Sequence, residues 1–213
     1  MARAKKVVVI HVQDEREKEE FFRELQKLRL PAFIYVHGKL NDLKINIQGT
    51  KDEIREATYR IKEIHKRVRA KLYPDRRGFY RYNVDDLFRE CGTSVSLPIL
   101  LKTLELLGEH AEVKEGELVT SMPFEELKGV VGKLGEYLAD LSYRTTKQIR
   151  EVILPVSVAR EMEPEEVLDM LVELTLAEWK EDKFKYELVK NKEQAMELLL
   201  NRLKSGEGEE NED

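Results

Sequence analysis

The sequence predicts an α+β protein with an N-terminal βαββα sandwich and a helix-rich second half. Residues 1–73 alternate between β-branched runs and amphipathic helical segments, in the order strand, helix, strand, strand, helix. A linker rich in arginine and aromatic residues, 74–82, separates them from a part of different composition. In that part, helix, turn, helix and hairpin follow one another twice, which indicates two similar modules.

The composition of the 213 residues limits the class of protein. Hydrophobic residues make up 41%, which suits two or three small cores better than one large core. The sequence has no run of about 18 apolar residues, such as a membrane-spanning helix needs, so we expect a cytoplasmic protein. Cys91 is the single cysteine and cannot form an intramolecular disulfide. The 37% of charged residues is typical of thermophilic proteins.

Each predicted element of the first module has a local reason. The β-branched run 5–12 predicts a buried strand. Segment 14–30 has an acidic first turn and apolar residues at helical spacing, so it predicts a helix, which Pro31 ends. Two further strands, 32–38 and 43–49, are joined by the turn-forming segment KLND.

A long helix closes this module. Thr50 is its predicted cap, and its apolar face consists of Ile54, Ala57, Ile61, Ile64, Val68 and Leu72. The segment INIQGTKDEIREATYRIKEI resembles the closing strand and helix of KH domains over about 25 residues. The resemblance implies a KH-like nucleic-acid-binding module, and a ferredoxin-like module has a similar build. The GxxG loop with which KH domains clamp a nucleic-acid backbone is absent, so binding would use the basic helix end and linker.

Residues 83–143 predict a further module. A short helix capped by Asn83 and a second helix with Pro98 in its first turn are followed by a hairpin that turns at residues 115–116. A helix that ends near Ser142 comes next. Helix, tight turn, helix and hairpin in this order resemble a winged helix-turn-helix, so we expect a winged-helix-like unit.

Residues 144–204 predict a second winged-helix-like unit. The preceding helical segment is expected to end at about Leu154, before Pro155. VSVAREM then predicts a short helix, EPEEVLDMLVELT a second helix, and the hairpin is expected to turn at residues 181–182. The segments HAEVKEGELV and LAEWKEDKFKYELV match at several positions, which we interpret as an internal repeat. Chance similarity between two hairpins rich in lysine and glutamate is the alternative. The acidic tail, 205–213, is expected to be disordered.

The candidate site is the basic stretch from His65 to Asn83. Residues 1–83 carry 21 basic and 12 acidic side chains, a net charge of +9, whereas the rest carries 16 and 30, a net charge of −14. Glutamates at helical i,i+4 spacing to arginines stop at Glu63, and the next acid is Asp75. Phosphates need cations and unstacked bases need flat rings, so this mixture favours single-stranded RNA. The predicted RNA-binding residues are Lys62, Lys66, Arg67, Arg69, Lys71, Tyr73, Arg76, Arg77, Phe79, Tyr80, Arg81 and Tyr82.

The sequence therefore predicts a non-enzymatic RNA-associated protein, such as a ribosome-associated or translation-linked factor. Its winged-helix-like units would contact a basic protein or a second copy of the chain. One alternative is a transcriptional regulator that binds duplex DNA through Lys102 and Thr103, although the matching helix of the second unit is acidic and would repel phosphate. The other is an adaptor without nucleic-acid contact, in which the basic stretch pairs with acids of the C-terminal half.

Residue patterns give no support for catalysis, a cofactor or a metal ion. The phosphate-binding motifs GxxxxGK[ST] and GxGxxG do not occur, and Cys91 precedes a glycine with no positioned base. Across its full length the chain also resembles an archaeal family of about 200 residues with no assigned function. That resemblance brings no catalytic residues.

Overall fold

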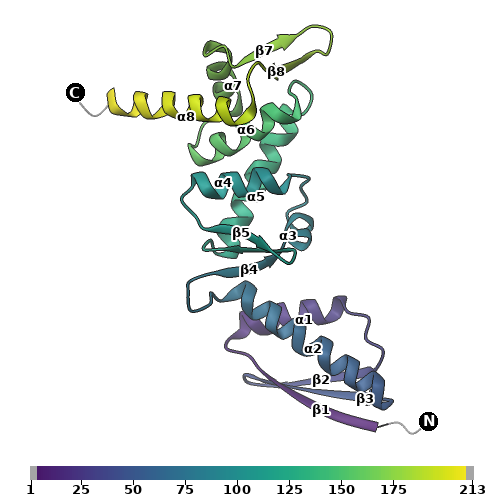
Figure 1. Cartoon of the computed structure of the whole chain (residues 1–213). Coiled ribbons are helices and arrows are strands. Elements are labelled where there is room, and N and C mark those ends of the chain that lie inside the picture. Colours follow the sequence, from purple (N-terminus) through teal and green to yellow (C-terminus); the bar gives the residue numbers. More distant parts are fainter. Residues whose placement is uncertain (1–3, 210–213) are drawn as a thin grey trace. The chain divides into compact units, whose positions relative to one another are not determined.

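Small sheets and helices make up the computed structural model, which describes residues 4–209 and the side chains of residues 4–205 (Figure 1). Within this range the chain forms eight helices and eight strands, and the strands lie in three small sheets. This mixture confirms the predicted α+β class. The chain divides into two compact units, Met1–Tyr82 and Asn83–Asp213, and each is described by itself.

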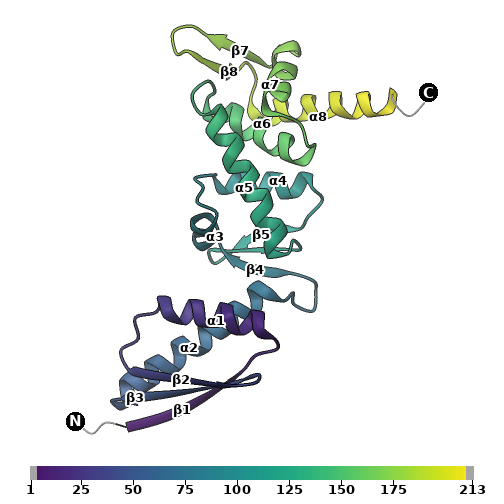
Figure 2. The same cartoon turned by 180° about the vertical axis from the view of Figure 1, so that it is seen from behind.

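The first unit has the predicted order of strand, helix, strand, strand, helix. Its elements are β1 (Ala4–His11), α1 (Glu15–Lys27), β2 (Phe33–Lys39), β3 (Asp42–Gly49) and α2 (Lys51–Leu72). The sheet order is β1-β3-β2, and both strand pairs are antiparallel. A two-residue turn joins β2 to β3, as the KLND segment predicts. Both helices lie on the same face of this sheet (Figures 1 and 2).

The core of the first unit lies between the sheet and its two helices. It includes Phe21 and Leu25 from α1 and Leu43, Ile45 and Ile47 from β3. The predicted apolar face of α2 is buried along its whole length. All residues of this core, and the partly buried ones packed against it, lie between positions 4 and 73. The first unit therefore has a core of its own.

Strand β1 differs from the predicted buried strand. Val8 and Ile10 are in the core, whereas Val7 and Val9 are 55% and 56% exposed. The strand lies at the edge of the sheet, and the helices cover only one face, so every second side chain points to solvent. β-Branched residues favour strand formation whether their side chains are buried or exposed. A continuous run of them therefore predicts the strand but not that one of its faces is open to solvent.

The division between the units falls at the last residue of β4, and two successive sets of elements follow from there; β4 is described with the first set because it belongs to the same sheet. The first set has a sheet of order β4-β6-β5 and consists of β4 (Tyr80–Asn83), α3 (Val84–Glu90), α4 (Leu97–Leu106), β5 (Ala111–Lys114), β6 (Glu117–Thr120) and α5 (Phe124–Leu141). The predicted cap Asn83 accepts a hydrogen bond from the Asp86 N–H at 2.9 Å. The hairpin turns at residues 115–116, as predicted, and both residues there have positive φ.

The second set repeats the order helix, helix, hairpin, helix. It consists of α6 (Lys147–Ala159), α7 (Pro164–Glu173), β7 (Ala177–Lys180), β8 (Lys185–Leu188) and α8 (Lys192–Glu209). Helix α8 includes residues 205–209, which the sequence assigned to a disordered tail. The remaining tail residues, 210–213, lie outside the described residues.

Helix α6 differs from the prediction that a helix ends before Pro155, because it continues to Ala159. A proline inside a helix removes one backbone hydrogen bond and costs about 3 kcal/mol. Burial offsets this cost, since every residue from Val152 to Val158 is buried. Helix α6 contacts α4, α5, α7 and α8, so it is the central helix of the second unit.

Candidate nucleic-acid interface

The last turns of α2 hold the helical part of the basic stretch. The apolar residues Ile64, Val68 and Leu72 face the core, which directs the intervening cations outward. Lys62, Lys66, Arg67 and Arg69 are exposed, and Lys71 is half-buried. The amphipathic pattern of one helix therefore both anchors α2 and presents its positive charge.

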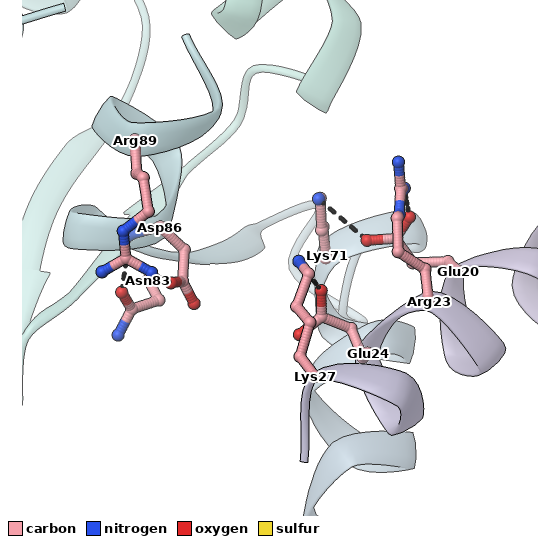
Figure 3. Close-up of polar contacts among 8 residues, drawn as sticks. All are labelled: Glu20, Arg23, Glu24, Lys27, Lys71, Asn83, Asp86 and Arg89. Carbon is pink, nitrogen blue, oxygen red and sulfur yellow. Dashed lines mark hydrogen bonds and ion pairs between the residues drawn. The ribbon is translucent and has the colours of Figure 1, made fainter. Parts of the chain in front are cut away.

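Two buried glutamates of α1 pair with part of this charge. Glu17 is fully buried, and its Oε1 lies 2.8 Å from His65 Nε2 and 3.8 Å from Arg69 Nε. Glu20 accepts a hydrogen bond from Lys71 Nζ at 3.0 Å and also pairs with Arg23 (Figure 3). A buried carboxylate is costly unless it is paired and hydrogen-bonded, so these contacts are needed for α1 to pack on α2.

These two partners were not predicted, because the acids expected to pair with the basic stretch lay either along the helix itself or in the C-terminal half. Glu17 and its partner His65 lie 48 positions apart in the sequence, and Glu20 and its partner Lys71 lie 51 positions apart. A signal was nevertheless present. Glu17 and Glu20 flank the apolar stripe of α1 that contains Phe21, so they lie at the border of the surface that packs against α2.

The loop after α2 uses its single acid to hold its own backbone. The Asp75 carboxylate accepts hydrogen bonds from the N–H groups of Arg77 at 2.8 Å and Phe79 at 3.1 Å. These bonds, with a smaller contribution from the charge of Arg77, lower the pKa of Asp75 below its usual value. Gly78 has a φ of +86°, which closes the turn. Asp75 therefore orders the loop that carries Arg76 and Arg77, both exposed.

Five cations of the predicted site are exposed and form no ion pair with any side chain that the structure describes. We call them the open cations: Lys62, Lys66, Arg67, Arg76 and Arg77. The i,i+4 pair of Glu56 with Arg60 is present, as its spacing indicates. Arg81 is also exposed and has an interaction partner, so it is not one of the open cations.

The aromatic residues of the basic stretch have roles within the fold. Tyr73 packs against the core of the first unit. The rings of Tyr80 and Tyr82 stack on each other, with centroids 6.1 Å apart, and Tyr82 is only 3% exposed. Phe79 is half-buried. A ring must offer an open face to stack on a base, so Tyr82 does not meet this requirement.

Tyr73 also has an unusual hydroxyl environment. Burial raises the pKa of Tyr73 to about 12, and the nearby Asp14 carboxylate contributes to the same shift. Asp14 is the cap of α1 and accepts a hydrogen bond from the Glu17 N–H at 2.8 Å, which lowers the pKa of Asp14. The Tyr73 hydroxyl at the end of α2 therefore lies near the Asp14 carboxylate at the start of α1.

The residues proposed for duplex DNA lie on α4 of the second unit. Thr103 is fully buried, and its hydroxyl donates a hydrogen bond to the Ile99 carbonyl at 2.8 Å. Lys102 Nζ pairs with Glu105 Oε1 at 2.8 Å. Thr103 therefore cannot reach a base, and Lys102 has an acidic neighbour on its own helix.

An open groove of about 830 Å³ also lies in the second unit, between α4, α6 and α8. It is lined by both charges, including the ion pair of Lys192 Nζ with Glu151 Oε2 at 2.7 Å. The Glu151 carboxylate raises the pKa of Lys192. Mixed charge of this kind does not favour a phosphate backbone.

Comparison with known protein families gives one match. The family described as "Uncharacterized protein conserved in archaea (DUF2067)" matches residues 10–197. The chain belongs to this family. The DUF2067 match begins in β1 and ends in α8, so it covers both units and confirms the resemblance to an archaeal family. No curated protein and no solved structure matched the chain.

Two further properties concern the residues that the structure describes. None of the helices within residues 4–209 is long and apolar enough to cross a membrane. In the same range, His, Cys, Asp and Glu side chains do not gather in groups of three or more that could hold a metal ion.

Proposed function

We propose that this DUF2067 protein is a non-enzymatic RNA-associated protein that acts with the ribosome or in translation. Its first unit contacts RNA through the open cations, and its second unit contacts protein. The observation that carries the proposal is the presence of five exposed cations without an ion-pair partner beside two cations that are paired. Like charges held close together repel one another, and a phosphate backbone relieves that repulsion.

The distribution of charge over the chain supports the same assignment. The excess of positive charge belongs to residues 1–83, and the acidic excess belongs to the rest. In the second unit, α7 begins with Glu165 and Glu166 in its first turn and has no basic residue in its last turn. Such a helix repels phosphate and suits a basic protein partner, so protein contact is the proposed use of the two winged-helix-like units.

The test of RNA contact is the salt dependence of binding. Wild-type protein should bind a labelled single-stranded RNA, with log K falling linearly with log salt concentration. Changing the five open cations to glutamine should weaken binding and reduce the steepness of this line by about 0.7 for each phosphate that the variant no longer neutralises. The measurement is fluorescence anisotropy between low and moderate salt.

A matched control removes five exposed cations of the second unit by the same substitution: Lys128, Lys147, Lys190, Arg202 and Lys204. This variant has the same net charge as the first one. Equal loss of affinity in both variants would show that net charge alone matters and would contradict the assigned surface. Absence of RNA binding by the wild type would contradict the function itself.

The protein partner is tested by capture from an archaeal cell extract with and without ribonuclease. The proposal expects ribosomal material in the captured fraction, part of which disappears after ribonuclease treatment. A fraction free of ribosomal and other RNA-containing particles under both conditions would favour the adaptor without nucleic-acid contact. The DNA-regulator alternative is disfavoured because Thr103 is buried.

A further inference from the structure

The face of the unit 1 sheet opposite the helices carries exposed aromatic side chains. Phe33 and Tyr35 of β2 are 72% and 60% exposed, and Val7 and Val9 of β1 lie on the same face. Both helices lie on the other face, so none of the unit's own helices covers these rings (Figures 1 and 2). Aromatic rings left in water at neighbouring positions mark a binding surface more often than isolated apolar residues do.

The strand register arranges this face in four rows across the sheet; the last is His11 with Asp42 and Lys39, and the other three carry the exposed apolar residues. Because β3 lies between β1 and β2, each row has a central polar side chain from β3 with one residue on either side. The other three rows are Lys5 with Gln48 and Phe33, Val7 with Asn46 and Tyr35, and Val9 with Lys44 and His37. Residues two apart on a strand are separated by about 7 Å, so the two rings stand side by side.

These three rows combine the groups that recognise single-stranded nucleic acid. Flat exposed rings stack on unstacked bases, and amide side chains such as Asn46 and Gln48 form hydrogen bonds with base edges. Lys5 and Lys44 supply positive charge, and none of the nine residues of these rows is acidic. Asp42 is the nearest acid of β3 on this face, and it is paired with His11, with Nδ1 and Oδ1 3.0 Å apart.

The same pattern disfavours a protein partner. Sheets that pack face to face bury an apolar centre. Here the centre of the face is polar along β3, with Lys44, Asn46 and Gln48, and the aromatic rings lie on an edge strand. Burial of Lys44 and the two amides against protein would leave polar groups without partners, whereas bases and phosphates provide them.

We infer that this sheet face binds single-stranded RNA, with Phe33 and Tyr35 stacking on successive bases and Asn46 and Gln48 contacting base edges. The inference rests on the proposed function and adds a second surface to it. Contacts of the open cations with phosphate carry no sequence information, whereas the sheet face contacts the bases themselves. The aromatic partners that the sequence placed in the linker are, in this assignment, on β2.

The test uses the full chain and a labelled 12-nucleotide oligouridylate. The double variant Phe33→Thr/Tyr35→Thr keeps strand-forming residues but removes both rings. It should lose about tenfold or more in affinity, while the dependence of binding on salt stays that of the wild type, because stacking releases no counterions. The control is Tyr143→Thr/Phe184→Thr, which removes two rings of the second unit that are 85% and 73% exposed. This control should bind like the wild type.

The possible outcomes separate the inference from the function on which it rests. If the wild type binds and the Phe33/Tyr35 variant binds equally well, the inference is wrong and the proposed function stands. If the wild type binds no RNA, both are wrong. If the wild type self-associates in sedimentation experiments and the double variant is monomeric with unchanged RNA affinity, the face is a contact between copies, and the inference is again wrong.

A second measurement does not depend on the folding of a variant. Wild-type protein is irradiated with an oligonucleotide that contains 4-thiouridine, and the cross-linked peptides are identified by mass spectrometry. Cross-links within β2 or β3 support the inference. Cross-links confined to residues 62–77 would place the bases at the helix end and overturn it.

Discussion

Glu17 is a single buried side chain that determines which positively charged residues of α2 are paired within the fold. Its buried carboxylate accepts a hydrogen bond from the Gln13 N–H at 2.8 Å and contacts His65. Since a carboxylate in the interior requires such partners, part of the positive charge at the end of α2 is committed to folding. The charge available for a ligand is therefore smaller than the sequence of the basic stretch suggests.

Removal of this carboxylate should destabilise the first unit. We expect Glu17→Ala to lower the free energy of unfolding by about 1–3 kcal/mol, because the Gln13 N–H and the side chains of α2 lose a buried partner. Urea unfolding followed by circular dichroism measures the change. Glu19→Ala, an exposed neighbour on the same helix, is the control and should have little effect. Equal stability of both variants would contradict the structural role of Glu17.

Tyr73 should make stability depend on alkaline pH. Its pKa is raised from 10.0 to about 12, so the folded state binds the phenol proton more tightly than the unfolded state does. The contribution of Tyr73 to the free energy of unfolding is complete below pH 10 and is lost as the pH rises towards 12. Tyr73→Phe should therefore lose less stability between about pH 9 and about pH 11.5 than the wild type does. Urea unfolding at both pH values measures this, with Tyr59→Phe, an exposed tyrosine of α2, as the control.

At the scale of the elements, local sequence signals set where helices and strands begin and end. Thr50 and Glu53 form a capping box, in which Glu53 Oε2 accepts a hydrogen bond from the Thr50 N–H at 2.8 Å. Asn83 caps α3 in the same position that the sequence predicts. Helix α2 carries three of the open cations, Lys62, Lys66 and Arg67, in its second half.

The capping box should contribute measurably to stability. We expect Thr50→Ala to lower the free energy of unfolding of the first unit by about 0.5–2 kcal/mol, since one N–H of the first turn loses its acceptor. Thermal unfolding measures the change. Thr50→Ser retains the hydroxyl and should remain close to the wild type, so a loss as large as that of Thr50→Ala would argue against the cap.

The features that the sequence did not predict depend on contacts between distant elements. Nothing within β1 distinguishes an edge strand with one open face from a central one, because the covering helices decide this. The pairing of Lys71 with Glu20 joins α2 to α1 and has no local pattern. Helix α6 continues through Pro155 because the surrounding helices bury it, which outweighs the local preference of proline. The cations of the candidate site could be predicted individually, but their partners could not.

At the scale of the whole molecule, the two units differ in the sign of their net charge, and each has its own buried residues. The first unit has a core formed entirely by residues between positions 4 and 73, and it belongs to the basic part of the chain. The second unit has α6 at its centre and belongs to the acidic part. Each function that we propose is therefore assigned to a unit with its own hydrophobic core.

A fragment of residues 1–79 should fold by itself. Its core is complete without the second unit, so we expect cooperative unfolding with urea and a circular dichroism spectrum with helical and strand contributions. It should also retain salt-dependent RNA binding, because the five open cations lie within it. A fragment without a cooperative transition would show that the first unit needs the rest of the chain.

The central position of α6 has a consequence for the synthesis of the chain. Helices α4 and α5 precede α6 and leave the ribosome earlier, whereas α7 and α8 follow it. Until those two helices are made, one side of a largely apolar helix stays exposed, and such surfaces aggregate or bind chaperones. A chain cut between α6 and α7 would remain in that state. The second unit therefore completes its folding only when its last helix has been synthesised.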